Sequence, residues 1–239
     1  METNQKKSLG NVLFWLGVVI ALILTALTTW ANIEAVVYGF TSYSKVSLRG
    51  VSCPPLMTRS EKAIISASIR NSSNNPLSVL IRADISTRSV ARSERVNEVL
   101  EPGETRKFEW NLSSSDVDLK HFIFARVYRY STPVWALAES TCGIFVLDIP
   151  FLTGRQIFWG GALLSLGCIA LGLWLTWQPG RPVQEGRKAN FGSAQTFLAV
   201  IALIGLLSGV MRSWLLGILV LVVAILLFAM FLLSKIDKQ

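Results

Sequence analysis

Charged residues are scarce in this chain. They make up 16% of its 239 residues, against roughly 25% in an ordinary soluble domain, whereas hydrophobic residues make up 51%. The apolar residues are concentrated in four stretches, each close to the roughly 20 residues that a helix needs to cross a bilayer. These stretches are 12–31, 157–177, 194–211 and 214–233. The composition therefore predicts a membrane protein with four transmembrane helices.

Ionisable residues are absent from the four stretches, which contain no Asp, Glu, Lys, Arg or His. Proton relays and most substrate-coupling sites place ionisable groups within the membrane, where they pair or face water. Their absence argues against a proton-coupled transporter or pump that acts alone.

Catalytic and metal-binding motifs are also missing. His121 is the only histidine, and the sequence has no CxxC or HExxH spacing and no GxxxxGK[ST] or GxGxxG loop, the patterns typical of zinc and phosphate sites. A Ser, His, Asp arrangement of His121 with Ser113 and Asp116 is formally possible, but that cluster is more typical of a polar turn before a strand. We therefore expect no catalytic residue, no metal, no cofactor and no enzymatic activity.

The net charge of +8 does not indicate a nucleic-acid partner. Residues 32–156 carry 15 Lys or Arg against 12 Asp or Glu, and the other 8 basic and 3 acidic residues flank the apolar stretches. Lys and Arg in such flanks set the orientation of a membrane protein. We therefore expect no nucleic acid among the partners.

The flanking charges predict an orientation. Seven of the basic residues fall on one side of the predicted topology: Lys6, Lys7, Arg181, Arg187, Lys188, Lys235 and Lys238. Arg212 alone lies in the other short connection. By the positive-inside rule, segments 1–11, 178–193 and 234–239 are cytoplasmic and segment 32–156 is extracytoplasmic. The sequence thus predicts a multi-pass protein of the plasma membrane, with both termini in the cytoplasm.

The first apolar stretch has an alternative interpretation as a secretory signal peptide. Thr29 and Ala31 are small residues of the kind found before a cleavage point. The apolar run of about 18 residues is longer than the usual signal core of roughly 7 to 15. We therefore expect a retained anchor.

Residues 32–156 show the residue pattern of a β-domain. Ile65, Ala67 and Ile69 alternate with polar residues, as expected for a strand with one buried face. About seven such segments are present, with turn residues such as Asn, Pro and Gly between them: 46–52, 65–69, 79–85, 95–100, 105–111, 122–130 and 141–148. This pattern resembles that of immunoglobulin-like and fibronectin-like domains, and it implies a β-sandwich inserted between the first and second helices.

Two of the three cysteines bracket this domain. Cys53 follows the first predicted strand, and Cys142 lies in the last. The first and last strands of a sandwich can be neighbours, and an extracytoplasmic compartment permits oxidation. We therefore predict a Cys53–Cys142 disulfide; two buried free thiols are the alternative.

Four arginines gather within a short segment, interleaved with Ser and Thr: Arg82, Arg88, Arg92 and Arg95. They form a candidate patch for an anionic ligand such as a lipid headgroup or phosphate. The alternative is a solvated hairpin edge, where charge discourages aggregation between strands. Glu94 and Glu98 partly neutralise the segment, which favours the edge interpretation.

Small residues form rows on two predicted helices. In the second helix the row is Gly161, Ser165, Cys168 and Gly172, and in the third it is Ala202, Gly205 and Gly209. Such faces let helix backbones approach closely in lipid. The rows pack either within this chain or on a partner, and we expect one of them to face outward.

These features favour a non-catalytic interaction or accessory subunit of a membrane assembly. Its partners would be membrane lipid and one or more proteins in the membrane or at its outer face. The order of elements, with one span, an outer domain and three further spans, resembles the layout of macrolide- and lipoprotein-exporter permeases. That resemblance implies a permease-like exporter subunit as an alternative, and the arginine patch implies an envelope lipid-handling protein as another.

Overall fold

The computed structural model describes residues 2–38, 40, 46–88, 91–131, 136–176 and 189–236. It divides into two compact units. The helical unit comprises Met1–Thr29 and Phe158–Gln239, and the β unit comprises Trp30–Ile157. Most of the predicted cytoplasmic loop 178–193 and the last residues of the chain lie outside the described residues.

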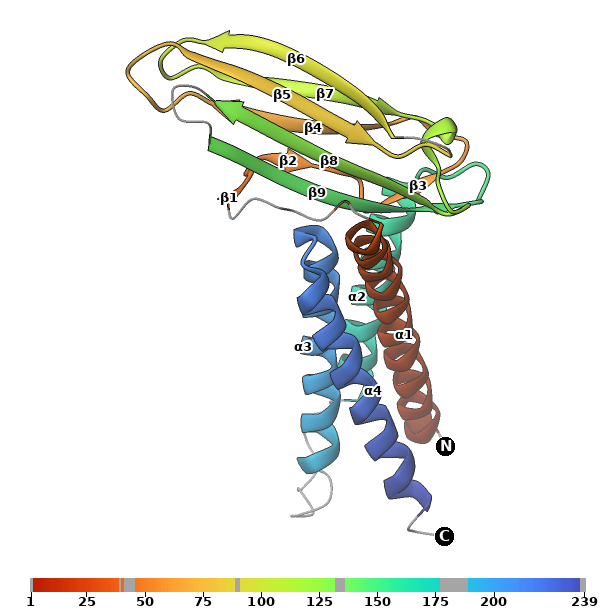
Figure 1. Ribbon diagram of the computed structural model, residues 1–239. Helices are drawn as coiled ribbons and strands as arrows, with labels where there is room; N and C mark the ends of the chain where they lie inside the picture. The colour runs from red at the N-terminus through yellow and green to blue at the C-terminus, as the bar shows by residue number, and fades with distance from the viewer. Residues whose placement is uncertain are drawn as a thin grey trace. The chain divides into compact units, whose positions relative to one another are not determined.

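The described residues contain four long helices (Figure 1). They are α1 (Glu2–Val37), α2 (Gly154–Thr176), α3 (Ala189–Met211) and α4 (Trp214–Ile236). Two of them are long and apolar enough to cross a membrane, over Ser8–Val37 and Gly154–Thr176. The apolar parts of α3 and α4 are shorter, Gln195–Met211 and Trp214–Met230. The four predicted helices are therefore present, and two of them have the length and composition of a membrane span.

The small-residue row of α2 lies against α1. A Cβ built at Gly172 would be 2.7 Å from the backbone nitrogen of Phe14. Ser165 is fully buried, and its hydroxyl donates a hydrogen bond of 2.7 Å to the carbonyl oxygen of Gly17. Such backbone proximity requires small residues on both helices.

The row of α3 also lies against α1. A Cβ built at Gly205 would be 2.7 Å from the hydroxyl of Thr25, and one at Gly209 would be 2.8 Å from the hydroxyl of Thr28. These hydroxyls donate to the carbonyl oxygens of their own helix, so polar atoms are satisfied where the glycines approach. The expectation that one row would face outward is wrong, because both rows pack against α1.

The strands of the β unit form two layers (Figure 1). The larger sheet has the order β1-β9-β8-β5-β6, with β3 also paired to β9, and the smaller sheet has the order β2-β4-β7. The strands are β1 (Val46–Ser47), β2 (Val51–Ser52), β3 (Leu56–Thr58), β4 (Ala63–Arg70), β5 (Leu77–Ile85), β6 (Arg92–Leu100), β7 (Thr105–Leu112), β8 (Phe122–Ser131) and β9 (Ala136–Leu147). The result is a β-sandwich-like domain inserted between α1 and α2.

The first part of the domain differs from the sequence prediction. The predicted strand 46–52 is divided at Gly50, whose φ of +83° favours glycine, so β1 and β2 enter different sheets. Strand β3 was not predicted, because Leu56, Met57 and Thr58 are all buried and therefore do not alternate between apolar and polar residues.

The core of the β unit is apolar and draws on both sheets. Ile65 and Trp110 from the smaller sheet pack with Ile81 and Ile123 from the larger one. The disulfide between Cys53 and Cys142 is present, with 6.6 Å between the Cα atoms. It links the end of β2 to β9, so it joins the two sheets. This prediction is confirmed.

The last turns of α1 belong to the β unit. The amide of Gly143 donates to the side-chain oxygen of Asn32 at 3.2 Å. A Cβ built at Gly143 would lie 1.9 Å from the carbonyl oxygen of Ala31, so no other residue fits there without movement. Trp30 packs edge-on against Phe122, with 5.4 Å between the ring centroids.

A candidate anion-binding cleft in the β unit

The four arginines of the predicted patch do not share one face. Arg82 and Arg95 are direct partners in the β5–β6 register and therefore lie on the same side of the larger sheet. Arg92 is paired with Ile85, a core residue, and lies on the opposite side. Arg88 is exposed beyond the end of β5. Side-chain alternation along the strands thus divides the set.

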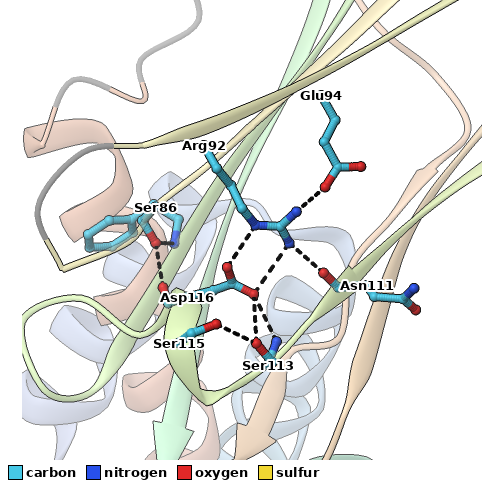
Figure 2. Close-up of polar contacts among 8 residues, drawn as sticks. Ser86, Arg92, Glu94, Asn111, Ser113, Ser115 and Asp116 are labelled. Carbon is cyan, nitrogen blue, oxygen red and sulfur yellow. Dashed lines mark hydrogen bonds and ion pairs between the residues drawn. The ribbon is translucent and has the colours of Figure 1, made fainter.

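Arg92 has a structural role (Figure 2). Its Nε donates a 2.8 Å hydrogen bond to Asp116, whose side chain is only 3% exposed, and this bond raises the pKa of Arg92. The same guanidinium donates to the carbonyl oxygen of Asn111 and pairs with Glu94. Asp116 also accepts from the amide of Ser113. Arg92 therefore connects β6 to the turn after β7.

Arg82 also forms an ion pair with a carboxylate. Its Nε lies 2.7 Å from Asp84, and this hydrogen bond raises the pKa of Arg82. Its guanidinium lies 5.8 Å from the ring centroid of Tyr128. Burial raises the pKa of the Tyr128 hydroxyl. Arg82 thus belongs to a packed polar cluster on the outer face of the larger sheet.

A different set of arginines lines an open cleft of about 780 Å³ at one end of the sandwich. The three are Arg49, Arg70 and Arg129. The remaining lining residues are small or apolar: Ser47, Leu48, Gly50, Ser68, Ile69 and Ala138. No carboxylate is among the described residues that line the cleft.

Both sheets contribute to this cleft. Arg49 lies in the turn between β1 and β2, Arg70 ends β4, and Arg129 lies near the end of β8. The turn is held against β4, because the amide of Ser68 donates to the carbonyl oxygen of Gly50 at 3.0 Å. A Cβ at Gly50 would lie 2.6 Å from the carbonyl oxygen of Ser68. The close approach of this turn thus places Arg49 beside the two strand ends.

The positive charge of the cleft is not compensated by any carboxylate among the residues that the structure describes. Within the described ranges, Arg49, Arg70 and Arg129 make no ion pair. The Nε of Arg129 is buried and has no hydrogen-bond partner among those residues. A buried donor without an acceptor costs roughly 1–3 kcal/mol, and more for a charged group. An oxyanion in the cleft could accept hydrogen bonds from guanidinium groups of more than one of these arginines.

The sequence pattern did not reveal this set, because its members are separated by 21 and 59 positions (49 to 70, and 70 to 129). One signal was present: each lies at or near the end of a predicted strand or beside a glycine turn. Only the pairing of strands in two sheets brings them together.

His121 is directed away from the polar cluster around Asp116. Its ring stacks on Phe145, and its Nδ1 lies 3.4 Å from the carbonyl oxygen of Val146. Asp116 is instead engaged by Arg92. In the part of the chain that the structure describes, no three His, Cys, Asp or Glu side chains are grouped as metal ligands would be.

Comparisons with known proteins assign no family. No family model matches the chain, and no curated protein sequence matches it. Among solved structures, Bacteroides uniformis β-glucuronidase 2 covalently bound to cyclophellitol-6-carboxylate aziridine is 15% identical over 39% of this chain, with a TM-score of 0.30. Bacteroides uniformis β-glucuronidase is 16% identical over 39%, with a TM-score of 0.29. The match spans 12% of each of those chains, and at these TM-scores it bears neither on the fold nor on the function.

Proposed function

We propose that this chain is a non-catalytic membrane protein whose β unit, an immunoglobulin- or fibronectin-like domain, binds an acidic segment of a protein partner outside the cytoplasm. The observation that carries the proposal is the cleft of Arg49, Arg70 and Arg129, three guanidinium groups with no carboxylate among the described residues of the lining. Arginine donors in a fixed geometry suit carboxylates, because the guanidinium fork forms two parallel hydrogen bonds.

The membrane topology is part of the proposal. All four helices would cross the plasma membrane, with both termini and segment 178–193 in the cytoplasm and segment 32–156 outside. The four uncharged apolar stretches and the seven basic residues that flank them support this orientation. The disulfide supports an oxidising compartment for the β unit.

The helices would serve as an anchor, and partner binding would reside in the β unit. The small-residue rows of α2 and α3 lie against α1. They are therefore occupied within the chain. This occupation shifts the interaction role from the helix faces to the cleft.

The test uses the full chain in nanodiscs of zwitterionic lipid. Binding of a fluorescent hexaglutamate peptide is measured by anisotropy, with hexaglutamine as the uncharged peptide. Arg49→Gln, Arg70→Gln and Arg129→Gln should each weaken hexaglutamate binding by about tenfold or more, since a charge-assisted hydrogen bond contributes roughly 1.5–3 kcal/mol. Added salt should weaken it further.

Arg95→Gln is the matched control, because Arg95 is exposed and lies outside the cleft. The affinity of the Arg95→Gln variant for hexaglutamate should equal that of the unmodified chain. Absence of hexaglutamate binding, or an equal loss in the control, would refute the role of the cleft. Binding of inorganic phosphate, measured by isothermal titration calorimetry, without binding of the peptide would instead assign the cleft to a phosphate ligand.

A further inference from the structure

The segment that precedes α2 exposes three large apolar side chains. Ile149 is 39% exposed, Leu152 is 47% exposed and Phe151 is 98% exposed. Phe151 also has a φ of +75°, in the left-handed region that is costly for a residue with a Cβ. Because the side chain of Phe151 is almost fully exposed, its burial within the chain does not offset this backbone cost.

The segment is nevertheless held firmly by the β unit. The hydroxyl of Thr58 donates to the carbonyl oxygen of Leu152 at 3.0 Å. Glu61 accepts hydrogen bonds from the amides of Thr58 and Gly154, at 3.1 and 2.9 Å. Glycine is required at position 154, since a Cβ there would lie 2.1 Å from the carbonyl oxygen of Leu56. Phe151 is therefore presented by a braced loop.

The helix start after this loop is capped as well. The amide of Thr153 donates to the side-chain oxygen of Gln156 at 2.9 Å, and the amide of Gln156 lies 3.2 Å from the hydroxyl of Thr153. This reciprocal pair is a capping box. It defines where α2 begins and how far Phe151 lies from it.

Basic groups lie beside the apolar ones. Arg155 is exposed in the first turn of α2. Arg59 is 41% exposed at its side chain; it lies 3.9 Å from Asp148 and donates to the carbonyl oxygen of Lys120. Segments that expose Trp, Phe or Leu together with Lys or Arg bury the apolar side chains at the boundary between lipid headgroups and acyl chains.

Chain connectivity indicates that lipid covers this exposed segment. Phe151 precedes the first residue of α2, Gly154, by three positions, so the two Cα atoms are separated by at most about 11 Å. If α2 spans the bilayer, Phe151 lies at the level of the outer headgroups. Val37 and Tyr38 at the end of α1 are 70% and 51% exposed. If α1 spans the bilayer, they also lie at the level of the outer headgroups.

We propose that Ile149, Phe151 and Leu152 insert into the headgroup layer of the outer leaflet and that Arg155 contacts lipid phosphate there. The proposal rests on the membrane span assigned to α2 under the proposed function. It gives the β unit a third attachment to the bilayer besides its two helical connections.

The experiment measures depth in the bilayer. Single cysteines are introduced into the full chain on a Cys168→Ala background, labelled with an environment-sensitive NBD fluorophore, and reconstituted in phosphatidylcholine vesicles with shallow or deep doxyl-labelled lipids. The probes are Phe151→Cys and Leu152→Cys in the loop. The controls are Leu163→Cys, on an exposed position of α2, and Asn74→Cys, in an exposed turn of the β unit.

Shallow doxyl groups should quench the probes at 151 and 152 more than deep ones do, deep groups should quench the probe at 163, and neither should quench the probe at 74. Quenching at 163 without quenching at 151 or 152 overturns the insertion of the loop and leaves the membrane span standing. No quenching at 163 refutes the span and the insertion together.

Discussion

At the scale of single residues, the direction of a side chain matters more than its place in the sequence. Arg82 and Arg92 are ten positions apart, yet β5 and β6 direct them to opposite sides of the larger sheet. Each is occupied by its own carboxylate, Asp84 or Asp116. By contrast, Arg49, Arg70 and Arg129 are far apart in sequence and meet in one cleft. A cluster of like residues along the chain is therefore a weak guide to a surface patch.

Replacement of Arg92 should destabilise the β unit. Asp116 is almost fully buried and Arg92 is about one-third exposed at its side chain. Loss of one partner of a buried pair costs roughly 3–5 kcal/mol, and the partial exposure of Arg92 reduces this to about 2 kcal/mol for Arg92→Gln. Denaturant unfolding of the full chain in detergent, followed by circular dichroism of the β-sheet, measures the loss.

Arg95→Gln is the control for this prediction. Arg95 is exposed, so its replacement should change the free energy of unfolding by less than about 0.5 kcal/mol. Equal effects of the two substitutions would show that the Arg92–Asp116 contact contributes nothing specific.

At the scale of elements, α2 has two kinds of glycine. Gly161 and Gly172 face α1, whereas a Cβ built at Gly160 or Gly167 would meet no atom within 4 Å. The same residue type therefore serves close packing on one face of the helix and is unconstrained on the other. The small-residue row of α2 is therefore an internal packing contact of the helical unit.

This difference predicts the effect of a larger side chain on each face. Gly172→Ile should lower the thermal stability of the helical unit, because overpacking costs typically about 1–3 kcal/mol and the new Cβ would be 2.7 Å from a backbone nitrogen of α1. Gly167→Ile, the matched control, should not. Thermal unfolding in mild detergent by circular dichroism compares the two. A lower stability for Gly167→Ile alone would mean that the opposite face of α2 is the packed one.

At the scale of the whole molecule, one disulfide links two cysteines that lie on either side of most of the β unit's sequence. Cys53 and Cys142 are separated by 89 positions and join the two sheets. In the chain-entropy model, closing a loop of this length stabilises the folded state by about 4–5 kcal/mol. The double substitution Cys53→Ala, Cys142→Ala should therefore lower the free energy of unfolding of the β unit by about that amount.

Denaturant unfolding of the full chain in detergent, without reductant, measures this effect. Cys168→Ala serves as the control, since Cys168 is a free cysteine of the helical unit. Reductant should reproduce the loss in the unmodified chain and leave the double variant unchanged. A loss below about 1 kcal/mol would show that the apolar core alone holds the sheets together.

The sequence by itself determined the helices, the class of the inserted domain and the disulfide. Those features follow from local or pairwise signals: long uncharged stretches for the helices, alternation along 65–69 and 79–85 for strands, and two cysteines at the ends of one domain. Strand β3 escaped detection because Leu56, Met57 and Thr58 are buried on both faces, which removes the alternation on which the prediction depends.

The tertiary structure alone decided which residues meet. The glycine rows of α2 and α3 carry the same signal whether they pack within the chain or on a partner, and only the position of α1 assigns them to internal contacts. The cleft arises because the turn at Gly50 passes from one sheet to the other and brings Arg49 beside Arg70 and Arg129. Register and sheet order are long-range properties, so no local pattern of residues encodes such a meeting point.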